Sequence, residues 1–360
     1  SACHVKGEWI MDFTFSEDQL LFQDSVRDFL VNEITTDAIR ASWETETGRS
    51  DALWAQLTEL GLTGMTVPEE FGGLGMDEVD FVLLAQECGY VALPEPLVHN
   101  VLVAVPLINA LSDELKAQWL PKIAEGSAKV AVGLTENFLV EDAHVANLLL
   151  LQHGDEIHAV DPADAKLTYN QSVDLSRKLF SVEWTPSAAT CVASGSEGAA
   201  LIEGAMNRGA LACAAQALGL TQRMIDLSVL YTSERVQFGK PIGSFQAVKH
   251  HMSNIAVKWE YAKAPVYRAA YAIAQGQSSA SLNTSHAKLA ACEAADLAAK
   301  NCIQVHGAMG YTWEVNLHIF MKKAWAFNNT WGDNAFHKNR VAEVIFAEDA
   351  KIGAGNTFVA

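Results

Sequence analysis

The sequence predicts a mainly α-helical protein with a small β domain in the middle of the chain. Long tracts rich in Ala, Leu and Met recur at helical spacing after residue 199, and shorter capped helical tracts fill the first 125 residues. Between them lie short apolar runs separated by turn residues. We therefore expect three domains, at residues 11–127, 128–196 and 197–360.

The first domain is predicted to be entirely helical. Ser16 to Gln19 has the spacing of a capping box, and helical tracts are expected at Ser50–Leu60, Asp77–Gly89 and Ser112–Glu125. The glycine-rich segment Gly61–Gly75 does not follow a strand, so it is not a dinucleotide-binding fingerprint. Residues 1–10 precede the first recognisable pattern, and we expect them to be an unstructured extension outside the fold.

Composition excludes several classes of function. The chain of 360 residues carries 25 basic and 43 acidic residues, for a net charge of −18. A chain this acidic repels nucleic acid and anionic membranes. Its six cysteines lack a Cys-x-x-Cys pair, as expected of reduced thiols in a cytoplasmic protein. The most apolar region, Val91–Leu111, is broken by three prolines and is not expected to span a membrane.

The middle and final domains follow from their periodicity. The long final helices have more apolar positions than one stripe needs, which predicts a bundle that assembles through its extra faces. Strands are expected at residues 130–135, 146–152, 157–160, 179–182 and 190–192, and long helices at residues 199–238, 244–275 and 278–305 with a final tract from Leu317.

The segment Arg235–Gln246 joins two of these long helices. We expect the first helix to end near Phe238–Gly239, Pro241 to prevent its continuation, and Ser244 to cap the next helix. Arg235 would then stand beside a tight turn, where a guanidinium can bind a phosphate through two hydrogen bonds. The alternative is a helix corner with a solvated arginine.

Four segments, in order, resemble the acyl-CoA dehydrogenase family from Met11 onward. They are Met-Asp-Phe-Thr-Phe-Ser-Glu-Asp-Gln at residues 11–19, Gly61–Gly75, Arg-Val-Gln-Phe-Gly-Lys-Pro-Ile at residues 235–242 with Phe245-Gln246, and Gln-Val-His-Gly-Ala-Met-Gly-Tyr-Thr at residues 304–312. The resemblance implies a helical domain, a barrel-like β domain and a C-terminal four-helix bundle. It also implies an FAD enzyme in which a glutamate removes the α proton of an acyl-CoA.

In the family, one subunit holds the flavin ring while its neighbour holds the pyrophosphate and adenosine of the same FAD. The glycine after Gly307 in the family pattern is Ala308 here. The resemblance assigns the neighbour's role to Arg235, Gln237, Phe238, Ile242, Phe245, Gln246, Gln304 and Gly307.

The positions of the family's catalytic glutamate are empty of carboxylates. Counting from Gln304 places Trp331 at the usual site, and counting back from Arg235 places Asn207 at the alternative one. Neither an indole nor an amide is a general base. Asp333 and Glu203 are the nearest candidates to replace it, and the competing interpretation is that Asp333 caps a helix and Glu203 is a solvated charge.

The β domain also departs from the family. Thr135 to Asp142 keeps only Thr-Glu of the family's Thr-Glu-Pro-x-x-Gly-Ser-Asp segment, and no Trp-Ile-Thr segment follows. Trp184 follows a different pattern and is expected in the core. The residues that would serve a neighbour's FAD remain, whereas those that would serve the chain's own flavin are lost.

The sequence therefore resembles the non-catalytic β-type subunit of the α2β2 acyl-CoA dehydrogenases of bacterial steroid side-chain catabolism. We expect FAD to be shared across the interface with a homologous catalytic chain, which binds most of the acyl-CoA. The alternatives are a self-sufficient dehydrogenase using Asp333 or Glu203, a scaffold without flavin, and a flavin oxidase acting on a substrate without CoA.

Two further expectations concern histidines and aromatic residues. No metal site is expected at the histidines, because His250 and His251 point in different directions on a helix; the others weighed are His286, His306 and His337. Aromatic rings are expected to fill the space where an acyl chain would lie, from Trp325, Phe327, Trp331 and Phe336.

Overall fold

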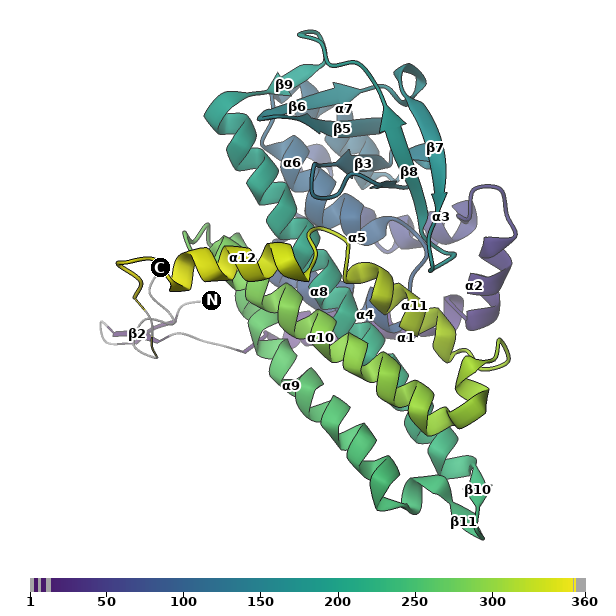
Figure 1. Ribbon diagram of the computed structural model, residues 1–360. Helices are drawn as coiled ribbons and strands as arrows, with labels where there is room; N and C mark the ends of the chain where they lie inside the picture. The colour runs from purple at the N-terminus through teal and green to yellow at the C-terminus, as the bar shows by residue number, and fades with distance from the viewer. Residues whose placement is uncertain (1–2, 6–7, 11–13, 352, 354–360) are drawn as a thin grey trace.

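The computed structural model describes residues 3–5, 8–10, 14–351 and 353, and it confirms a mainly helical chain with a small β domain (Figure 1). The strands of the β domain lie at one end of the molecule, and the turns that join the longest helices after residue 234 lie at the other. Residues 3–5 and 8–10 pair as the antiparallel strands β1 (Cys3–Val5) and β2 (Glu8–Ile10), which differs from the expected unstructured extension.

Capping side chains mark the starts of the helices in the first part of the chain, and the predicted capping box at Ser16 is confirmed. Ser16 forms a capping box with Gln19, and Ser50, Asp77 and Ser112 each cap a helix by accepting a backbone N–H. Helix α2 was not predicted. The bounds are α1 Glu17–Glu33, α2 Thr36–Trp43, α3 Asp51–Glu59, α4 Glu78–Tyr90 and α7 Asp113–Ala124.

The apolar region between α4 and α7 lies inside the protein. It forms α5 (Leu97–His99), a π-helical turn at Asn100–Ala104 and α6 (Val105–Asn109), nearly all of it buried. Among the described residues, no helix has both the length and the apolar character needed to cross a membrane.

Two small sheets form the β domain. One has the strand order β3-β5-β6-β9 and the other β4-β8-β7. The pair β3–β5 is parallel and the remaining pairs are antiparallel. The bounds are β3 Val130–Gly133, β4 Val140–Glu141, β5 Leu148–His153, β6 Glu156–Val160, β7 Lys166–Gln171, β8 Lys178–Glu183 and β9 Cys191–Ala193.

Strand β5 is buried on both faces, which explains its uninterrupted run of leucines. Leu149 and Leu151 pack with Phe180 in a core shared by the two sheets. Leu148 and Leu150 face the opposite way and join the main helical core. Alternate side chains of a strand point to opposite faces, so this one strand connects both cores.

The C-terminal domain is built around α8, a helix of 40 residues from Gly195 to Glu234. It packs in a bundle with α9 and α10 (Figure 1). Helices α11 and α12 pack against α10 in the same domain. The bounds are α9 Gln246–Ala274, α10 Ala280–His306, α11 Leu317–Phe327 and α12 Asn334–Ile345.

Helices α4 and α8 cross in backbone contact, and glycine permits the approach. A Cβ at Gly219 would lie 1.9 Å from the Gln86 carbonyl oxygen, and a Cβ at Gly89 would lie 2.1 Å from the Gln216 carbonyl oxygen. Each helix thus contributes a glycine at the point where the other's backbone passes. The crossing joins the first domain to the bundle.

We expect Gly219→Ala to lower the free energy of unfolding by about 2 kcal/mol or more, because the methyl group has no room against a backbone oxygen. Gly204→Ala on the same helix is the matched control. A Cβ there meets only the flexible end of Arg208, at 3.2 Å, so the control gains roughly 0.5–1 kcal/mol from helix propensity. Urea unfolding measures both, and equal effects would contradict the proposed crossing constraint.

Candidate functional site

The segment after α8 is a tight hairpin. The helix ends at Glu234, four residues before the predicted end at Phe238–Gly239, which was wrong. Strand β10 (Val236–Gln237) then pairs with β11 (Lys240–Pro241). Phe238 and Gly239 both have positive φ, of 52° and 76°, as a type I′ turn requires. A phenylalanine in this conformation carries no sequence signal, which is why the helix was predicted to continue.

The start of the next helix also differs from the prediction. Helix α9 begins at Gln246, with Phe245 at its N-cap and no side-chain cap. Ser244 was predicted as the cap, but it lies in a 3₁₀ turn and its hydroxyl donates to the Pro241 carbonyl at 2.7 Å. The hairpin is closed by the Ile242 N–H, which donates to the Arg235 carbonyl at 2.8 Å.

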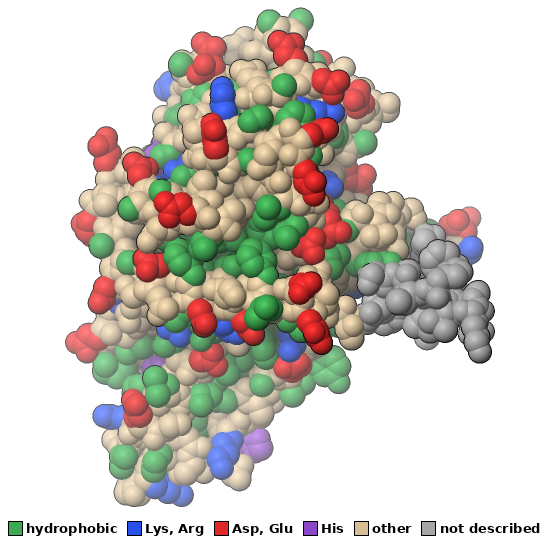
Figure 2. Space-filling view, turned by 180° about the vertical axis from the view of Figure 1, so that it is seen from behind, with side chains coloured by type: hydrophobic (Ala, Val, Ile, Leu, Met, Phe, Trp, Pro, Cys, Tyr) green, Lys and Arg blue, Asp and Glu red, His purple; other side chains and the backbone are tan. Residues whose placement is uncertain are grey.

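The hairpin is exposed and positively charged. Phe238 is 91% exposed, and its ring meets Phe245 edge-on with centroids 6.2 Å apart. The Arg235 side chain is exposed and has no hydrogen-bond or ion-pair partner among the described residues. Figure 2 shows Lys and Arg side chains at the lower end of the molecule, where Figure 1 places β10 and β11. A free guanidinium in a basic patch is suited to bind an anion.

The loop after α10 lies at the same end of the bundle (Figure 1). Tyr231, near the end of α8, stacks on His306 with ring centroids 4.2 Å apart, and its hydroxyl donates to the His306 carbonyl at 3.4 Å. Gln304 and Gly307 are both exposed beside this contact. The structure thus places the end of α8, which leads into the Arg235 hairpin, against the end of α10, although the two are far apart in the sequence. Of the other predicted FAD-binding residues, Gln237 and Gln246 are exposed, and Ile242 is half-buried.

Trp331 lies far from this hairpin, near the junction of the β domain and the bundle. It is 3% exposed, and its ring fills the space beside Gly209, where a Cβ would lie 2.1 Å from the indole. The indole N–H donates to His99 Nε2 at 3.1 Å, and the Trp331 carbonyl is 2.9 Å from His337 Nε2. The ring is therefore fixed through both its side chain and its backbone.

The three other aromatic residues expected near Trp331 differ in their burial. Phe327 is buried, whereas Trp325 and Phe336 are half-buried. Phe336 lines an open groove instead of filling a closed space. That these rings occupy the position of an acyl chain stays a prediction.

The remaining candidate residues are held in other interactions. Asn207 donates to the Ser281 hydroxyl at 2.9 Å and accepts from Arg340 at 3.0 Å. Glu203 is exposed and accepts from the same two residues, at 2.6 Å from Ser281 and 3.3 Å from Arg340. Asp333 caps α12 by accepting the Phe336 N–H at 2.8 Å. Both carboxylates thus have the structural roles of the competing interpretation.

A buried charge cluster beside Trp331 was not anticipated from the sequence. Arg177 pairs with Glu141 at 3.0–3.2 Å, Arg49 pairs with Asp142, and Lys323 lies 2.9 Å from Asp174. Its members come from distant parts of the chain, and a single sequence does not show which charges meet. Only the spacing of Glu141 and Asp142 within the altered family segment pointed to this region.

The cluster determines the chemistry available there. Burial alone would raise the pKa of Glu141, but the charges of Arg177 and His99 lower it to about 2. Burial raises the pKa of Asp142 to about 7, opposed by the charge of Arg49 and increased by that of Glu141. Burial lowers the pKa of His99. Glu141 is thus a weak base, and Asp142 is held by Arg49.

The space around these groups is small. A cavity of about 20 Å³, with room for about one water molecule, is lined by His99, Asn137, Glu141, Asp142 and Trp331 among others. A larger open groove of about 600 Å³ runs between the β domain and helices α8 and α12. It is lined by Thr135, Glu136, Gln152, Ala199, Ile202, Glu203, Met206, Phe336, Asn339, Arg340 and Glu343.

Comparison with known proteins defines the class of the molecule. Residues 16–127 match the family model of the acyl-CoA dehydrogenase N-terminal domain, and residues 196–346 match that of the acyl-CoA dehydrogenase C-terminal domain. The chain belongs to the acyl-CoA dehydrogenase family, whose members typically bind FAD.

Individual relatives agree with this assignment. The acyl-CoA dehydrogenase IpdE2 of Mycolicibacterium smegmatis is 30% identical over 310 residues, which cover 86% of this chain and 93% of IpdE2. The ChsE4–ChsE5 complex of Mycobacterium tuberculosis has the same fold, with a TM-score of 0.84 at 21% identity, covering 96% of this chain and 100% of the matched chain. The Tcur3481–Tcur3483 steroid ACAD has the same fold, with a TM-score of 0.82 at 22% identity. The match covers 91% of this chain and 98% of the matched chain.

We expect the stability of the fold to decrease between pH 6.5 and pH 4 through His337. Burial, followed by the charge of Lys288, lowers the pKa of this imidazole to about 4. The unfolded chain, with a pKa of about 6.5, then binds a proton that the folded chain does not, so stability present above pH 6.5 is lost on acidification. The free energy of unfolding differs between pH 7 and pH 4.5, and His337→Gln should reduce this difference by about 2 kcal/mol. Urea unfolding at the two pH values measures it.

The control for this measurement is His250→Gln, at an exposed position of α9. It should keep the pH dependence of the unmodified protein. An unchanged pH dependence in His337→Gln would show that His337 is not the group responsible.

Proposed function

We propose that the chain is the non-catalytic subunit of a heteromeric FAD-dependent acyl-CoA dehydrogenase. The observation that carries this proposal is Trp331. The position assigned to the catalytic glutamate holds a buried indole, fixed by His99 and packed on Gly209. No proton can be abstracted by that residue. The base therefore belongs to a homologous catalytic partner.

The exposed hairpin is the part of the chain that serves the partner's cofactor. FAD, when bound, supplies the acceptor for the hydride that leaves the β carbon of the acyl group. The exposed Arg235 guanidinium suits the FAD pyrophosphate, because its planar fork can bind two phosphate oxygens. Gln304 and Gly307 lie at the same end of the bundle and would hold the adenosine, with Gln237, Phe238, Ile242, Phe245 and Gln246 around them.

The other half of a working site is missing from the chain. The cavity beside Trp331 has room for about one water molecule. Of the two carboxylates that line it, Glu141 has a pKa of about 2 and Asp142 is engaged in its ion pair with Arg49. A thioester cannot enter, and a carboxylate this acidic is a poor general base. The acyl-CoA would therefore bind mainly to the partner.

Exposed apolar side chains support assembly with another chain. Large ones lie on the C-terminal half of α8, on its hairpin, on α9 and after α10, beside the residues assigned to FAD. Exposed apolar surface of this extent is typical of an interface. These side chains are Val229, Leu230, Val236, Phe238, Val257, Tyr261, Tyr311 and Trp313.

The proposed substrate is a steroid side-chain CoA thioester. Support comes from the similar folds of the ChsE4–ChsE5 complex and of the Tcur3481–Tcur3483 steroid ACAD. The first is a complex of two differently named chains, which supports pairing with a homologous chain. We propose that this pairing is an α2β2 assembly with one FAD per heterodimer.

We expect the chain purified alone to contain little FAD and to reduce no electron acceptor with acyl-CoA. Co-expression with a paralogue that retains the glutamate should give about one FAD per heterodimer, measured by flavin absorbance after denaturation. Stoichiometric FAD and dehydrogenation by the chain alone would contradict the proposal. In that case Glu203→Gln and Asp333→Asn would identify the base, because one of them should abolish turnover.

Arg235→Ala in the complex tests the role of the hairpin. Loss of two charged hydrogen bonds to phosphate should weaken FAD binding by about 2–3 kcal/mol, or roughly 30- to 150-fold. Lys166→Ala, which removes an exposed charge on β7, is the control and should retain FAD. Unchanged FAD content in Arg235→Ala would favour a scaffold without flavin, and peroxide formation without CoA ligands would favour an oxidase.

A further inference from the structure

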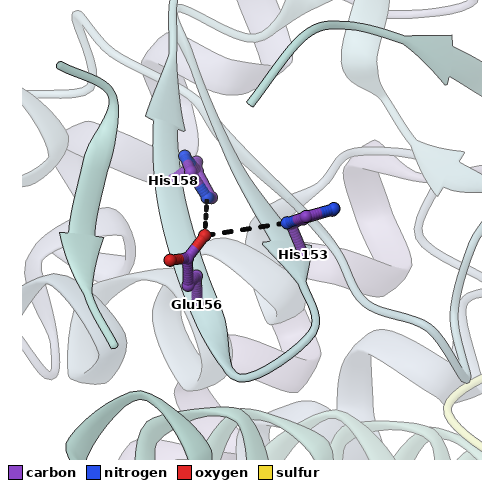
Figure 3. A group of neighbouring side chains, drawn as sticks. All are labelled: His153, Glu156 and His158. Carbon is purple, nitrogen blue, oxygen red and sulfur yellow. Dashed lines mark hydrogen bonds and ion pairs between the residues drawn. The ribbon is translucent and has the colours of Figure 1, made fainter. Parts of the chain in front are cut away.

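A cluster of two imidazoles and one carboxylate lies on the β5–β6 hairpin, outside the site described above (Figure 3). Strand β5 ends at His153 and β6 begins at Glu156, and these two residues are paired across the turn. His158 lies two residues after Glu156 on the same strand. Directly opposed residues share a face of the sheet, and so do residues two apart. The fold therefore places all three side chains on one face.

The three side chains converge on one point. Glu156 Oε2 lies 3.0 Å from His158 Nε2 and 3.6 Å from His153 Nδ1. One ligand atom from each residue lies within 4.8 Å of the others. Figure 3 shows the two rings approaching the carboxylate from different sides. His158 is 1% exposed, whereas His153 is at the surface and open to solvent.

The hydrogen bonding of His158 explains why a cation fits between the groups. Its Nδ1 lies 3.0 Å from the Thr190 hydroxyl oxygen, and that hydroxyl donates to the Ser187 carbonyl at 3.1 Å. With its proton used there, the Thr190 oxygen accepts from His158 Nδ1–H. His158 Nε2 faces a Glu156 carboxylate oxygen 3.0 Å away. A positive charge between these two atoms satisfies both, either as a proton on Nε2 or as a bound cation.

The donor set indicates the kind of ion. Two imidazoles and a carboxylate suit Zn²⁺ and neighbouring divalent transition metals. Imidazole nitrogen binds these metals in preference to Ca²⁺ or Mg²⁺, which favour oxygen ligands. Zinc ligands at about 2.1 Å stand about 3.4 Å apart in a tetrahedral site. The two distances to Glu156 bracket this value, and the exposed His153 ring can move to complete the set. The Thr190 contact to the second ring nitrogen matches the outer-shell support of metal-bound histidines.

We propose that His153, Glu156 and His158 bind one divalent transition-metal ion, represented by Zn²⁺. The ion would join β5 to β6 next to their turn. The same hairpin rests on the start of α8, because a Cβ at Gly198 would lie 2.0 Å from the Asp155 carbonyl oxygen. The site thus lies where the β domain meets the longest helix, at the end of the molecule opposite the Arg235 hairpin (Figure 1).

Isothermal titration of the metal-free full-length chain with ZnCl₂ tests this site. We expect the unmodified chain to bind one ion. In both His153→Gln and Glu156→Gln, the heat of binding should disappear or the affinity should fall at least about tenfold. Two control proteins should bind zinc as the unmodified chain does. One is His286→Gln, which changes an exposed histidine outside the cluster. The other is the double variant Cys3→Ser with His4→Gln, which removes the one adjacent cysteine–histidine pair in the sequence.

Anomalous diffraction at the zinc edge then locates the ion. A peak between the three side chains is the expected result. Absence of binding heat up to millimolar zinc would reduce the cluster to a hydrogen-bonded histidine–carboxylate group and overturn the proposal. Binding that survives both cluster variants, or a peak elsewhere, would overturn it too. FAD content of the heteromer is a separate readout, so failure here leaves the proposed subunit role unaffected.

Discussion

The close crossing of α4 and α8 is the constraint on which the arrangement of the protein depends. Gly89 and Gly219 let two helix backbones meet without side chains between them. This contact fixes the direction of α8, whose two ends then lie at opposite poles of the molecule. One end carries the β domain and the other carries the Arg235 hairpin. A single long helix therefore separates the β domain from the hairpin that we propose binds the FAD pyrophosphate.

Trp331, at the position that we propose corresponds to the family's base, is an integral part of the core. It packs on Gly209, donates to His99 and, through its backbone, connects to His337 on α12. The neighbouring ion pairs of Glu141 and Arg177 complete a filled, hydrogen-bonded interior. Restoring a glutamate at residue 331 would place a charge in this interior without its present contacts, so recovering a base there would require changes at several positions.

The sequence predicted those features whose causes are local or repetitive. The capping serines and the leucines of β5 act through neighbours in the chain, and the long helices repeat one pattern many times. The end of α8 was misplaced because it depends on Phe238 taking a positive φ, which the hairpin and not the residue type imposes. Strand β7 was missed because most of its side chains are exposed. The Arg49–Asp142 pair and the His153 cluster were missed because they depend on tertiary placement or strand register.

The basic hairpin has a consequence for how the chain meets another protein. The molecule carries a net charge of −18, yet its exposed Arg235, Lys240 and Lys249 lie at one pole. Such a charge distribution is an electric dipole. A second acidic chain is repelled by the body and attracted by the pole, so diffusional encounters are oriented before any side chain makes contact. The same local charge that suits a cofactor phosphate thus selects the orientation of collision, with an association rate that responds to ionic strength.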